Sequence, residues 1–291
     1  MGGIESNART AASSPAGAAP RTDAGSAAHE DVEQAASGSS GPAVPGTAGQ
    51  ATNGASERAT RGRTVRVIEV KQSVFASNDR EADELRARLR ARGTFLLNLM
   101  SSPGSGKTTT LARTVGLLAP RLSMGVMEAD IDSDVDAKTM AATGVPAVQL
   151  HTGGMCHLDA AMCEQGLAEL DRAVADAGAA PLDLAILENV GNLVCPAEFD
   201  TGASANVAIL SVPEGDDKPL KYPLMFQVCD LVLVNKMDVA PYFDFDYDRL
   251  RENVRLRNPH ARVIPISAKT GEGMEAWASW LYAKVMDWKE A

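Results

Sequence analysis

The residues best suited to chemistry lie in a glycine-rich turn that joins an apolar strand to a helix. Residues 95–110 read FLLNLMSSPGSGKTTT, and the first six of them predict a strand buried on both faces. Gly106, Lys107 and Thr108 open the helix. In such a turn backbone N–H groups surround a β-phosphate, the lysine reaches the β- and γ-phosphate oxygens, and the threonine hydroxyl coordinates Mg²⁺. The stretch therefore predicts a phosphate-binding loop.

The loop departs at one position from the common pattern G-x4-G-K-S/T, because Ser101 stands where the first glycine is usual. A serine can take this place if its φ angle is negative. A Gly/Ser turn that merely precedes a helix is the alternative, but it leaves the combination of strand, turn and Gly-Lys-Thr core unexplained. We expect the phosphates to bind the loop residues Gly104, Ser105, Gly106, Lys107, Thr108 and Thr109.

A second motif predicts which base is bound. Residues 231–238 read LVLVNKMD, an apolar strand followed by Asn-Lys-x-Asp. The Asp238 carboxylate can accept hydrogen bonds from both N1–H and the exocyclic amino group of guanine, a pair of donors that adenine lacks. Asn235 can hydrogen-bond the base edge, and the stem of Lys236 can lie along the ring. The motif therefore favours a guanine nucleotide.

A Ser-Ala-Lys turn further along the chain completes the predicted base site. Ser267, Ala268 and Lys269 follow the strand-like run VIPI, and a backbone N–H of this turn is expected to meet guanine O6. One Asn-Lys-x-Asp match is weak alone, and an ordinary polar turn after a strand would also explain it. Its position downstream of a phosphate-binding loop and upstream of Ser-Ala-Lys makes guanine binding the stronger interpretation.

The sequence Glu-Asn-Val-Gly after the strand-like run LAIL has the spacing of a γ-phosphate sensor. The Gly191 N–H would bond the γ-phosphate, and Glu188 would reach Mg²⁺ through water. Asp130 is our first choice for another carboxylate on the Mg²⁺ side and Asp132 the second, although a solvated acidic loop is the alternative. No arginine finger or catalytic glutamine can be assigned, so slow turnover is expected. The expected catalytic residues are Lys107, Thr108, Asp130 and Glu188.

Three side chains suited to softer metals form the remaining candidate site. Cys156 and His157 are adjacent, and Cys195 comes four residues after Gly191. Two thiols and an imidazole suit Zn²⁺ or Ni²⁺, whereas small buried cysteines beside a histidine are the plainer alternative. Three ligands leave tetrahedral Zn²⁺ one short, so water or a second copy of the chain would supply the fourth.

The other two cysteines are expected to be core residues. A helix is expected over 156–173, on which Cys163 would lie about 10.5 Å along the axis from Cys156, too far to share one ion. Cys229 lies in the apolar run MFQVCDLV.

Strands and helices alternate along the chain and would position these residues. The alternation predicts an α/β fold of three layers, a mostly parallel sheet with helices on both faces. Strands are expected at 64–70, 95–100, 123–129, 145–150, 182–187, 206–212, 231–234 and 262–266. Helices are expected at 79–92, 106–118, 156–173 and 274–288, with another ending near 140.

Composition restricts the class of protein. The chain has 291 residues, of which 45% are hydrophobic, enough for one sizeable domain with a tail. A net charge of −10 argues against sequence-independent binding to nucleic acid. No apolar stretch approaches the about 18–20 residues of a membrane span, and the start MGGIESNART lacks an export signal. We therefore expect a cytoplasmic protein without disulfides.

Residues 1–62 differ in composition from the remainder. They are rich in Ala, Gly, Ser, Thr and Pro and have almost no large apolar side chains, so they cannot offset the entropy of ordering. We expect a disordered tail at 1–62, dispensable for nucleotide hydrolysis, and one nucleotide- and metal-binding domain at 63–291.

The motifs together resemble one family. From about Thr64 to the C-terminus, the chain is similar to HypB, the family of nickel-incorporation GTPases of NiFe-hydrogenase maturation. Urease accessory GTPases share the nucleotide motifs, but the Cys-His…Cys arrangement matches the hydrogenase family better. The resemblance is carried by SSPGSGKTTT, EADIDSDVDA, HTGGMCHLDA, LENVGNLVCP, EGDDKPLKYPLMF and NKMD.

The resemblance implies a P-loop fold of the SIMIBI class, hydrolysis of GTP to GDP, and a homodimer that forms on GTP binding with metal at its interface. By motif position, Cys156, His157 and Cys195 become ligands of Ni²⁺ or Zn²⁺, and Thr108 and Asp130 serve Mg²⁺. The implied partners are the zinc/nickel chaperone HypA and the hydrogenase large-subunit precursor. The implied function is a metallochaperone in which GTP hydrolysis gates nickel delivery. A urease-type nickel-insertion GTPase and a metal chaperone with a structural nucleotide are the alternatives.

Two departures from the family are visible. The segment before Thr64 has no cysteine and a single histidine, His29, so it lacks the cysteine-rich or histidine-rich nickel motifs of some members. Ser102 stands where several relatives in the wider class carry a second lysine, so no lysine at this position can act in trans.

We expect the protein to bind GTP in preference to ATP because of Asn235 and Asp238. The change Asp238→Asn should weaken GTP binding and reduce discrimination of guanine from xanthine, because a carboxylate acceptor becomes a mixed donor and acceptor. Equilibrium binding of GTP, XTP and ATP measures both effects. Equal affinity of the native protein for ATP and GTP would contradict the interpretation.

Overall fold

The computed structural model describes most of the chain from residue 56 onward. The chain divides into two units, residues 1–51 and 52–291, and only the second contains described residues. Asp132, most of the predicted helix that ends near 140 and most of the predicted tail lie outside the described residues. The backbone of Asp130 is described as the end of a strand, but the Asp130 side chain is not described. The described residues are 56–60, 63–69, 75–130, 140 and 142–291.

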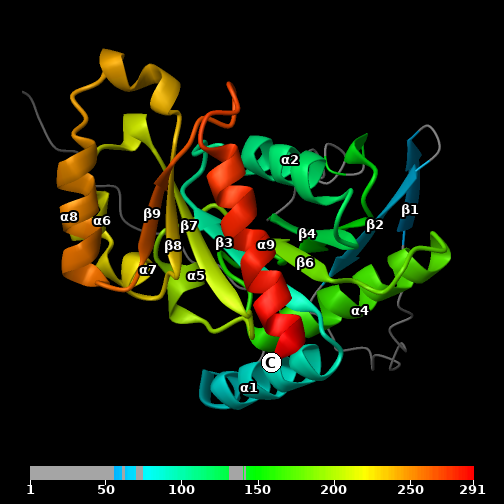
Figure 1. Ribbon diagram of the computed structural model, residues 1–291. Coiled ribbons are helices and arrows are strands. Elements are labelled where there is room, and N and C mark those ends of the chain that lie inside the picture. The colour runs from blue at the N-terminus through cyan, green and yellow to red at the C-terminus, as the bar shows by residue number, and fades with distance from the viewer. Residues whose placement is uncertain (1–55, 61–62, 70–74, 131–139, 141) are drawn as a thin grey trace, which may run out of the picture. The chain divides into compact units, whose positions relative to one another are not determined.

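A mostly parallel sheet organises the second unit (Figure 1). Among the described residues its strand order is β1-β2-β5-β4-β6-β3-β7-β8-β9, and every neighbouring pair is parallel except β1 with β2. The predicted strands are therefore present within a few residues of their expected bounds. Those bounds are β1 Ser56–Thr60, β2 Arg63–Glu69, β3 Phe95–Ser101, β4 Met124–Asp130, β5 Ala147–His151, β6 Leu184–Glu188, β7 Ala205–Ser211, β8 Leu231–Asn235 and β9 Arg262–Pro265.

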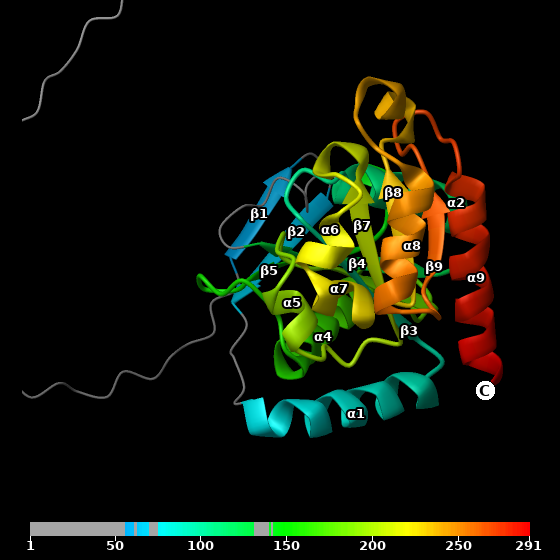
Figure 2. The same cartoon turned by 90° about the vertical axis from the view of Figure 1, so that its left-hand side faces the viewer.

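Helices cover both faces of this sheet, which confirms the predicted α/β class. Alternate residues of β8 divide between two cores: Leu231 and Leu233 pack in the core that holds α2 and α9, and Val232 and Val234 in the core that holds α7 and α8. Figure 2 shows α9 on one side of the strands and α6 and α7 on the other. The helices are α1 Phe75–Ala91, α2 Lys107–Leu118, α4 Ala160–Asp176, α5 Cys195–Glu198, α6 Lys218–Lys221, α7 Pro223–Gln227, α8 Tyr247–Arg257 and α9 Met274–Glu290.

The helix expected at 156–173 begins later than predicted, at Ala160. Asp159 is its N-cap, and the Asp159 carboxylate accepts a hydrogen bond from the Met162 N–H at 2.8 Å. Cys156 therefore lies in the preceding loop, and the expected helical spacing from Cys156 to Cys163 was wrong. The assignment of Cys163 to the core holds, because the residue is fully buried.

Several elements were not expected from the sequence: strand β1, the short helices α5, α6 and α7, and the longer helix α8. Helix α8 has few apolar residues, and it is anchored by Arg249, which donates two hydrogen bonds to the buried Asp216 carboxylate at 2.9 and 2.6 Å. Strand β1 lies within the predicted tail at 1–62, because antiparallel pairing with β2 uses backbone groups and needs no large apolar side chain. None of the described helices combines the length and apolarity needed to cross a bilayer.

A chain that begins at Arg63 would lack β1 but keep every predicted site residue. We expect it to hydrolyse GTP as fast as a chain that begins at Thr52, because β2, β5, β4 and β6 separate β1 from β3. Its Tm should be lower, by about 2–4 °C for each kcal/mol of pairing free energy lost. Phosphate release and thermal unfolding measure the two effects. A folded shorter chain without hydrolysis would contradict this expectation.

Candidate functional site

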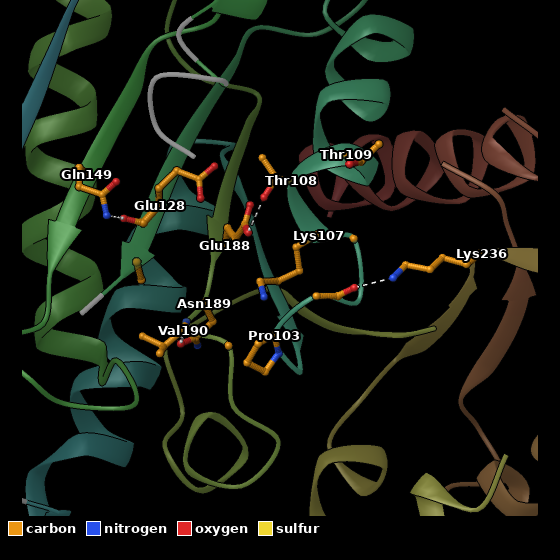
Figure 3. A pocket seen from close by; sticks show the side chains of 14 residues that line it. Pro103, Lys107, Thr108, Thr109, Glu128, Gln149, Glu188, Asn189, Val190 and Lys236 are labelled. Atoms are coloured by element: carbon orange, nitrogen blue, oxygen red, sulfur yellow. Dashed lines mark hydrogen bonds between the residues drawn. The ribbon is translucent and has the colours of Figure 1, made fainter. Parts of the chain in front are cut away.

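The phosphate-binding loop opens into a cavity of about 570 Å³ at the carboxyl ends of β3, β4 and β6. Figure 3 shows Lys107 and Thr108 reaching this cavity from the first turn of α2. Gly106 precedes the helix with a φ of +97°, and a Cβ there would lie 2.4 Å from the Asn235 amide nitrogen. The turn therefore requires glycine at this position.

Ser101 fits the position where the loop pattern usually has glycine. Lys236 is the single non-glycine residue with positive φ in the described part of the chain, so Ser101 has the negative φ that we expected. The buried Ser101 hydroxyl oxygen accepts from the Ser105 hydroxyl at 2.7 Å and from the Lys107 ammonium at 2.9 Å. The next residue, Ser102, donates its hydroxyl to the Glu214 carboxylate. The serine pair therefore connects the loop to its surroundings through side chains.

Two of the residues expected on the Mg²⁺ side, Thr108 and Glu188, face each other. The Thr108 hydroxyl donates to the Glu188 carboxylate at 3.3 Å, and Glu188 is buried at the end of β6. Gly191 also lines the cavity, and a Cβ there would lie 3.2 Å from the Pro103 ring. The predicted γ-phosphate sensor and the phosphate-binding loop are therefore in direct contact.

The predicted base site forms a second cavity, of about 190 Å³. It shares Gly106, Thr109 and Lys236 with the phosphate cavity, so the two are continuous. The Asp238 carboxylate lines it and accepts a hydrogen bond from the Ser267 hydroxyl at 2.7 Å, which fixes one of its oxygens. The Lys236 ammonium donates to the Gly104 carbonyl at 2.7 Å, so the lysine stem spans from base site to phosphate loop.

Asn235 positions the loops around the base site through its side-chain amide. It is buried, its Nδ2 donates to the Ser105 carbonyl at 2.9 Å, and its Oδ1 accepts from the Lys236 and Ala268 N–H groups at 2.8 and 3.0 Å. An amide oxygen has two acceptor positions, and both are used. These bonds hold the loops around the nucleotide site in place, and the contact of Asn235 with the base edge stays a prediction.

Arg113 belongs to the base site although no sequence signal marked it. This residue of α2 donates from Nε to the Ala268 carbonyl at 3.1 Å and from Nη2 to the Lys269 carbonyl at 2.9 Å. The Ser-Ala-Lys turn is thus held by the helix that follows the phosphate-binding loop. An arginine in the middle of a helix carries no motif, so only the tertiary structure identifies this contact.

The two cysteines proposed as metal ligands lie together. A hydrogen bond with the Cys156 thiol, together with burial, raises the pKa of the Cys195 thiol. Cys156 Sγ lies 4.0 Å from Nδ1 of His157, and the His157 ring stacks on Phe199 with 3.7 Å between the centroids. Burial lowers the pKa of His157, which favours the neutral imidazole that binds metals. The predicted trio therefore occupies one region.

Helix α1 joins the two chain segments that carry these candidates. The buried Asn78 side chain accepts from the Ala160 N–H at 2.9 Å and donates to the Asp200 carbonyl at 3.0 Å. Arg86 Nη2 adds hydrogen bonds to both oxygens of the Asp200 carboxylate, at 2.8 Å each. Sequence reasoning missed Asn78, because its partners are far from it along the chain.

The candidates do not yet form a complete metal centre. Within the described residues, no three or more His, Cys, Asp or Glu side chains are placed so that they could hold an ion. His157 Nε2 is buried and has no hydrogen-bond partner in that part of the chain. A metal at this place therefore requires small movements or a ligand from elsewhere.

Arg113→Ala should weaken GDP and GTP binding by about 10-fold, because two carbonyl groups of the base-binding turn lose a charged donor. The GDP and GTP affinities of Arg113→Lys should lie between those of Arg113→Ala and those of the native protein. Arg121→Ala is the matched control, because Arg121 follows the same helix and lies over the Tyr282 ring. Fluorescent-nucleotide titration measures the affinities. Equal GDP affinity in Arg113→Ala and the control would contradict the assigned role.

Comparison with known proteins agrees with this geometry. Residues 95–265 match the family described as CobW/HypB/UreG, nucleotide-binding domain. The chain is 49% identical over 216 residues to hydrogenase maturation factor HypB of Azotobacter vinelandii, covering 74% of this chain and 69% of that one. It is 45% identical over 216 residues to HypB of Escherichia coli K12, covering 74% and 72%.

Two solved structures are similar throughout the nucleotide-binding unit. The crystal structure of HypB from Helicobacter pylori in complex with nickel gives a TM-score of 0.67 at 38% identity, covering 72% of this chain and 96% of that one. HypB from Archaeoglobus fulgidus gives 0.65 at 36% identity, covering 72% and 100%. These matches confirm the resemblance inferred from the motifs. The chain belongs to the CobW/HypB/UreG family of nucleotide-binding proteins and, within it, to the HypB hydrogenase maturation factors.

Proposed function

We propose that this protein is a GTP-hydrolysing metallochaperone in which nucleotide state gates nickel delivery during NiFe-hydrogenase maturation. The observation that carries the proposal is the short connection between two candidate sites. Gly191 lines the phosphate cavity, and Cys195, four residues later, lies beside Cys156. A movement of the sensor segment toward a γ-phosphate therefore moves one metal ligand relative to the other two.

Hydrolysis is supported by the groups around the phosphate cavity. The Lys107 ammonium and the loop N–H groups are placed to stabilise charge on the transferring phosphoryl group, with water as nucleophile. The Thr108 hydroxyl and the Glu188 carboxylate, 3.3 Å apart, are suited to hold Mg²⁺, which would supply positive charge beside the β- and γ-phosphate oxygens. Asp130, the last residue of β4, is a further candidate for the Mg²⁺ side.

Guanine specificity is supported by the fixed orientation of Asp238. Because Ser267 donates to Asp238 Oδ1 at 2.7 Å, the carboxylate is held where it can receive the two donors of guanine. Ala268 and Lys269 of the same turn line the base cavity. Among the common purine nucleotides, this donor and acceptor pattern suits GTP and GDP.

The cargo is Ni²⁺ or Zn²⁺, bound by Cys156, His157 and Cys195. A neutral imidazole and two thiols that lose protons on binding are a borderline-soft donor set. Three ligands leave a position for another donor, and Val194, beside Cys195, has 45% of its surface exposed. We infer a GTP-dependent homodimer across this surface, which would bring the ligands of two chains together. HypA and the hydrogenase large-subunit precursor would be the proteins that give and receive the metal.

Titration of Ni²⁺ and Zn²⁺ into protein loaded with GDP or with a non-hydrolysable GTP analogue tests the proposal. We expect the two loaded forms to differ in metal affinity by about 5–150-fold, and bound metal must change nucleotide affinity by the same factor. Cys195→Ala should abolish the measured binding, which identifies the site. Lys107→Ala should bind metal with one affinity whichever nucleotide is added, because it loses the phosphate contact.

Identical metal affinities in the two loaded forms of the native protein would leave the metal site as a passive store. In that case the nucleotide would be only a structural ligand. Phosphate release from GTP, measured on the same samples, shows separately whether the protein is a GTPase.

A further inference from the structure

Three buried polar residues form a row across neighbouring strands at the phosphate cavity. Glu128 of β4 is the register partner of Gln149 on β5 and of Glu188 on β6, so all three side chains leave the sheet at one level. They are 2%, 1% and 3% exposed, respectively, and all three line the cavity. Figure 3 shows the Glu128 carboxylate directed toward Thr108 and Glu188. We call these three residues the polar row.

The order of the strands shows where the polar row lies relative to the base cavity and the phosphate-binding loop. The base cavity lies at the ends of β8 and β9, the phosphate-binding loop follows β3, and β6, β4 and β5 come next across the sheet. A nucleotide with its base at Asp238 and its β-phosphate in the loop therefore extends its γ-phosphate toward β6 and β4. In-line attack requires the nucleophile beyond the γ-phosphorus, opposite the bridging oxygen. That position lies over Glu128 and Gln149.

The orientation of the Gln149 side-chain amide leaves its oxygen, Oε1, in need of a hydrogen-bond donor. Its Nε2 donates to the Glu128 carbonyl at 2.9 Å, which leaves Oε1 as an acceptor. Within the described part of the chain this buried Oε1 has no hydrogen-bond partner. Buried acceptors are rarely left unpaired. Triphosphate oxygens and carboxylates are also acceptors, so water is the donor that this end of the cavity can supply.

We propose that Glu128 and Gln149 are catalytic residues that hold the attacking water, an inference that rests on the proposed GTPase function. One water proton is donated to Gln149 Oε1 and the other to the Glu128 carboxylate, which leaves a lone pair facing the γ-phosphate. The water oxygen bonds to the γ-phosphorus as the bond to the β,γ-bridging oxygen breaks, and that electron pair leaves on GDP. One water proton passes to Glu128 and then to the released phosphate.

Glu188 and Glu128 thus have separate tasks in the polar row. Glu188 receives the Thr108 hydroxyl, the group expected to coordinate Mg²⁺, and stands nearest the phosphate-binding loop. Glu128 is one strand further out, next to the amide that has an open acceptor. The nearer carboxylate serves the metal side, and the farther one serves the nucleophile.

Single-turnover GTP hydrolysis by the full chain, with saturating Mg²⁺, tests the assignment. Glu128→Gln keeps the shape and removes the charge, and we expect it to lower the rate by about 100-fold or more. Gln149→Met keeps approximate volume and removes the acceptor, and should lower the rate by about 10-fold. The Kd for a non-hydrolysable GTP analogue should stay near that of the native protein in both, because neither residue is assigned to ground-state binding.

A second measurement separates catalysis from packing. GDP with aluminium fluoride imitates the transferring phosphoryl group together with its attacking water, so both variants should lose affinity for this complex while they retain affinity for GDP. The same substitutions on α4, Glu164→Gln and Gln165→Met, are matched controls. Glu164 pairs with Arg88 at the surface, and Gln165 bonds the Ala161 carbonyl of its own helix.

Several outcomes would overturn the assignment. A folded Glu128→Gln that hydrolyses GTP at the native rate removes Glu128 from catalysis, and the same result in Gln149→Met removes Gln149. Recovery of the Glu128→Gln rate at higher Mg²⁺ concentration would place Glu128 among the magnesium ligands instead. A native protein that binds but never hydrolyses GTP overturns the proposed function itself, and the polar row with it. If Gln149→Met does not fold, the isosteric Glu128→Gln decides alone.

Discussion

The buried amide of Asn235 is the interaction on which the nucleotide site depends. It joins three backbone segments that are far apart in the sequence, through the Ser105 carbonyl and the N–H groups of Lys236 and Ala268. Its closeness to Gly106 leaves no room for a side chain at that loop position. Phosphate and base cavities therefore keep one relative geometry, and Arg113 reinforces it from α2. Loss of a single buried amide would disturb both ends of the nucleotide together.

A similar arrangement supports the metal-ligand region. Asn78 of α1 bonds the backbone at Ala160 and Asp200, the segments that follow His157 and Cys195 respectively. The stacking of His157 on Phe199 brings the same two segments together by a second contact. The proposed movement of Cys195 would therefore take place between a fixed end near Asp200 and the predicted γ-phosphate sensor at Gly191. Because the segment from Gly191 to Asp200 is short, a small displacement of Gly191 would change the distances from Cys195 to Cys156 and His157.

Much of this site could be predicted from the sequence because its signals are local. The phosphate-binding loop, the sensor glycine and Asp238 each follow an apolar strand, and strand ends at one edge of a parallel sheet must meet. The later start of α4 was missed because the capping strength of Asp159 outweighed apolar periodicity. Glu128 and Gln149 were missed for another reason, since their meeting depends on the register between strands, which no single stretch encodes. The contacts of Asn78 and Arg113 likewise exist only in the tertiary structure.

The two edges of the sheet have a consequence for how copies of the chain can associate. One edge strand, β1, carries the sequence SERAT with Glu57 and Arg58, and the other, β9, is four residues long and ends at Pro265. Charged residues, short length and proline all discourage a further strand from adding to an edge. Continuous growth by strand addition is therefore disfavoured at both edges of the described sheet, and a homodimer such as the one proposed above would have to form through loops and helices instead.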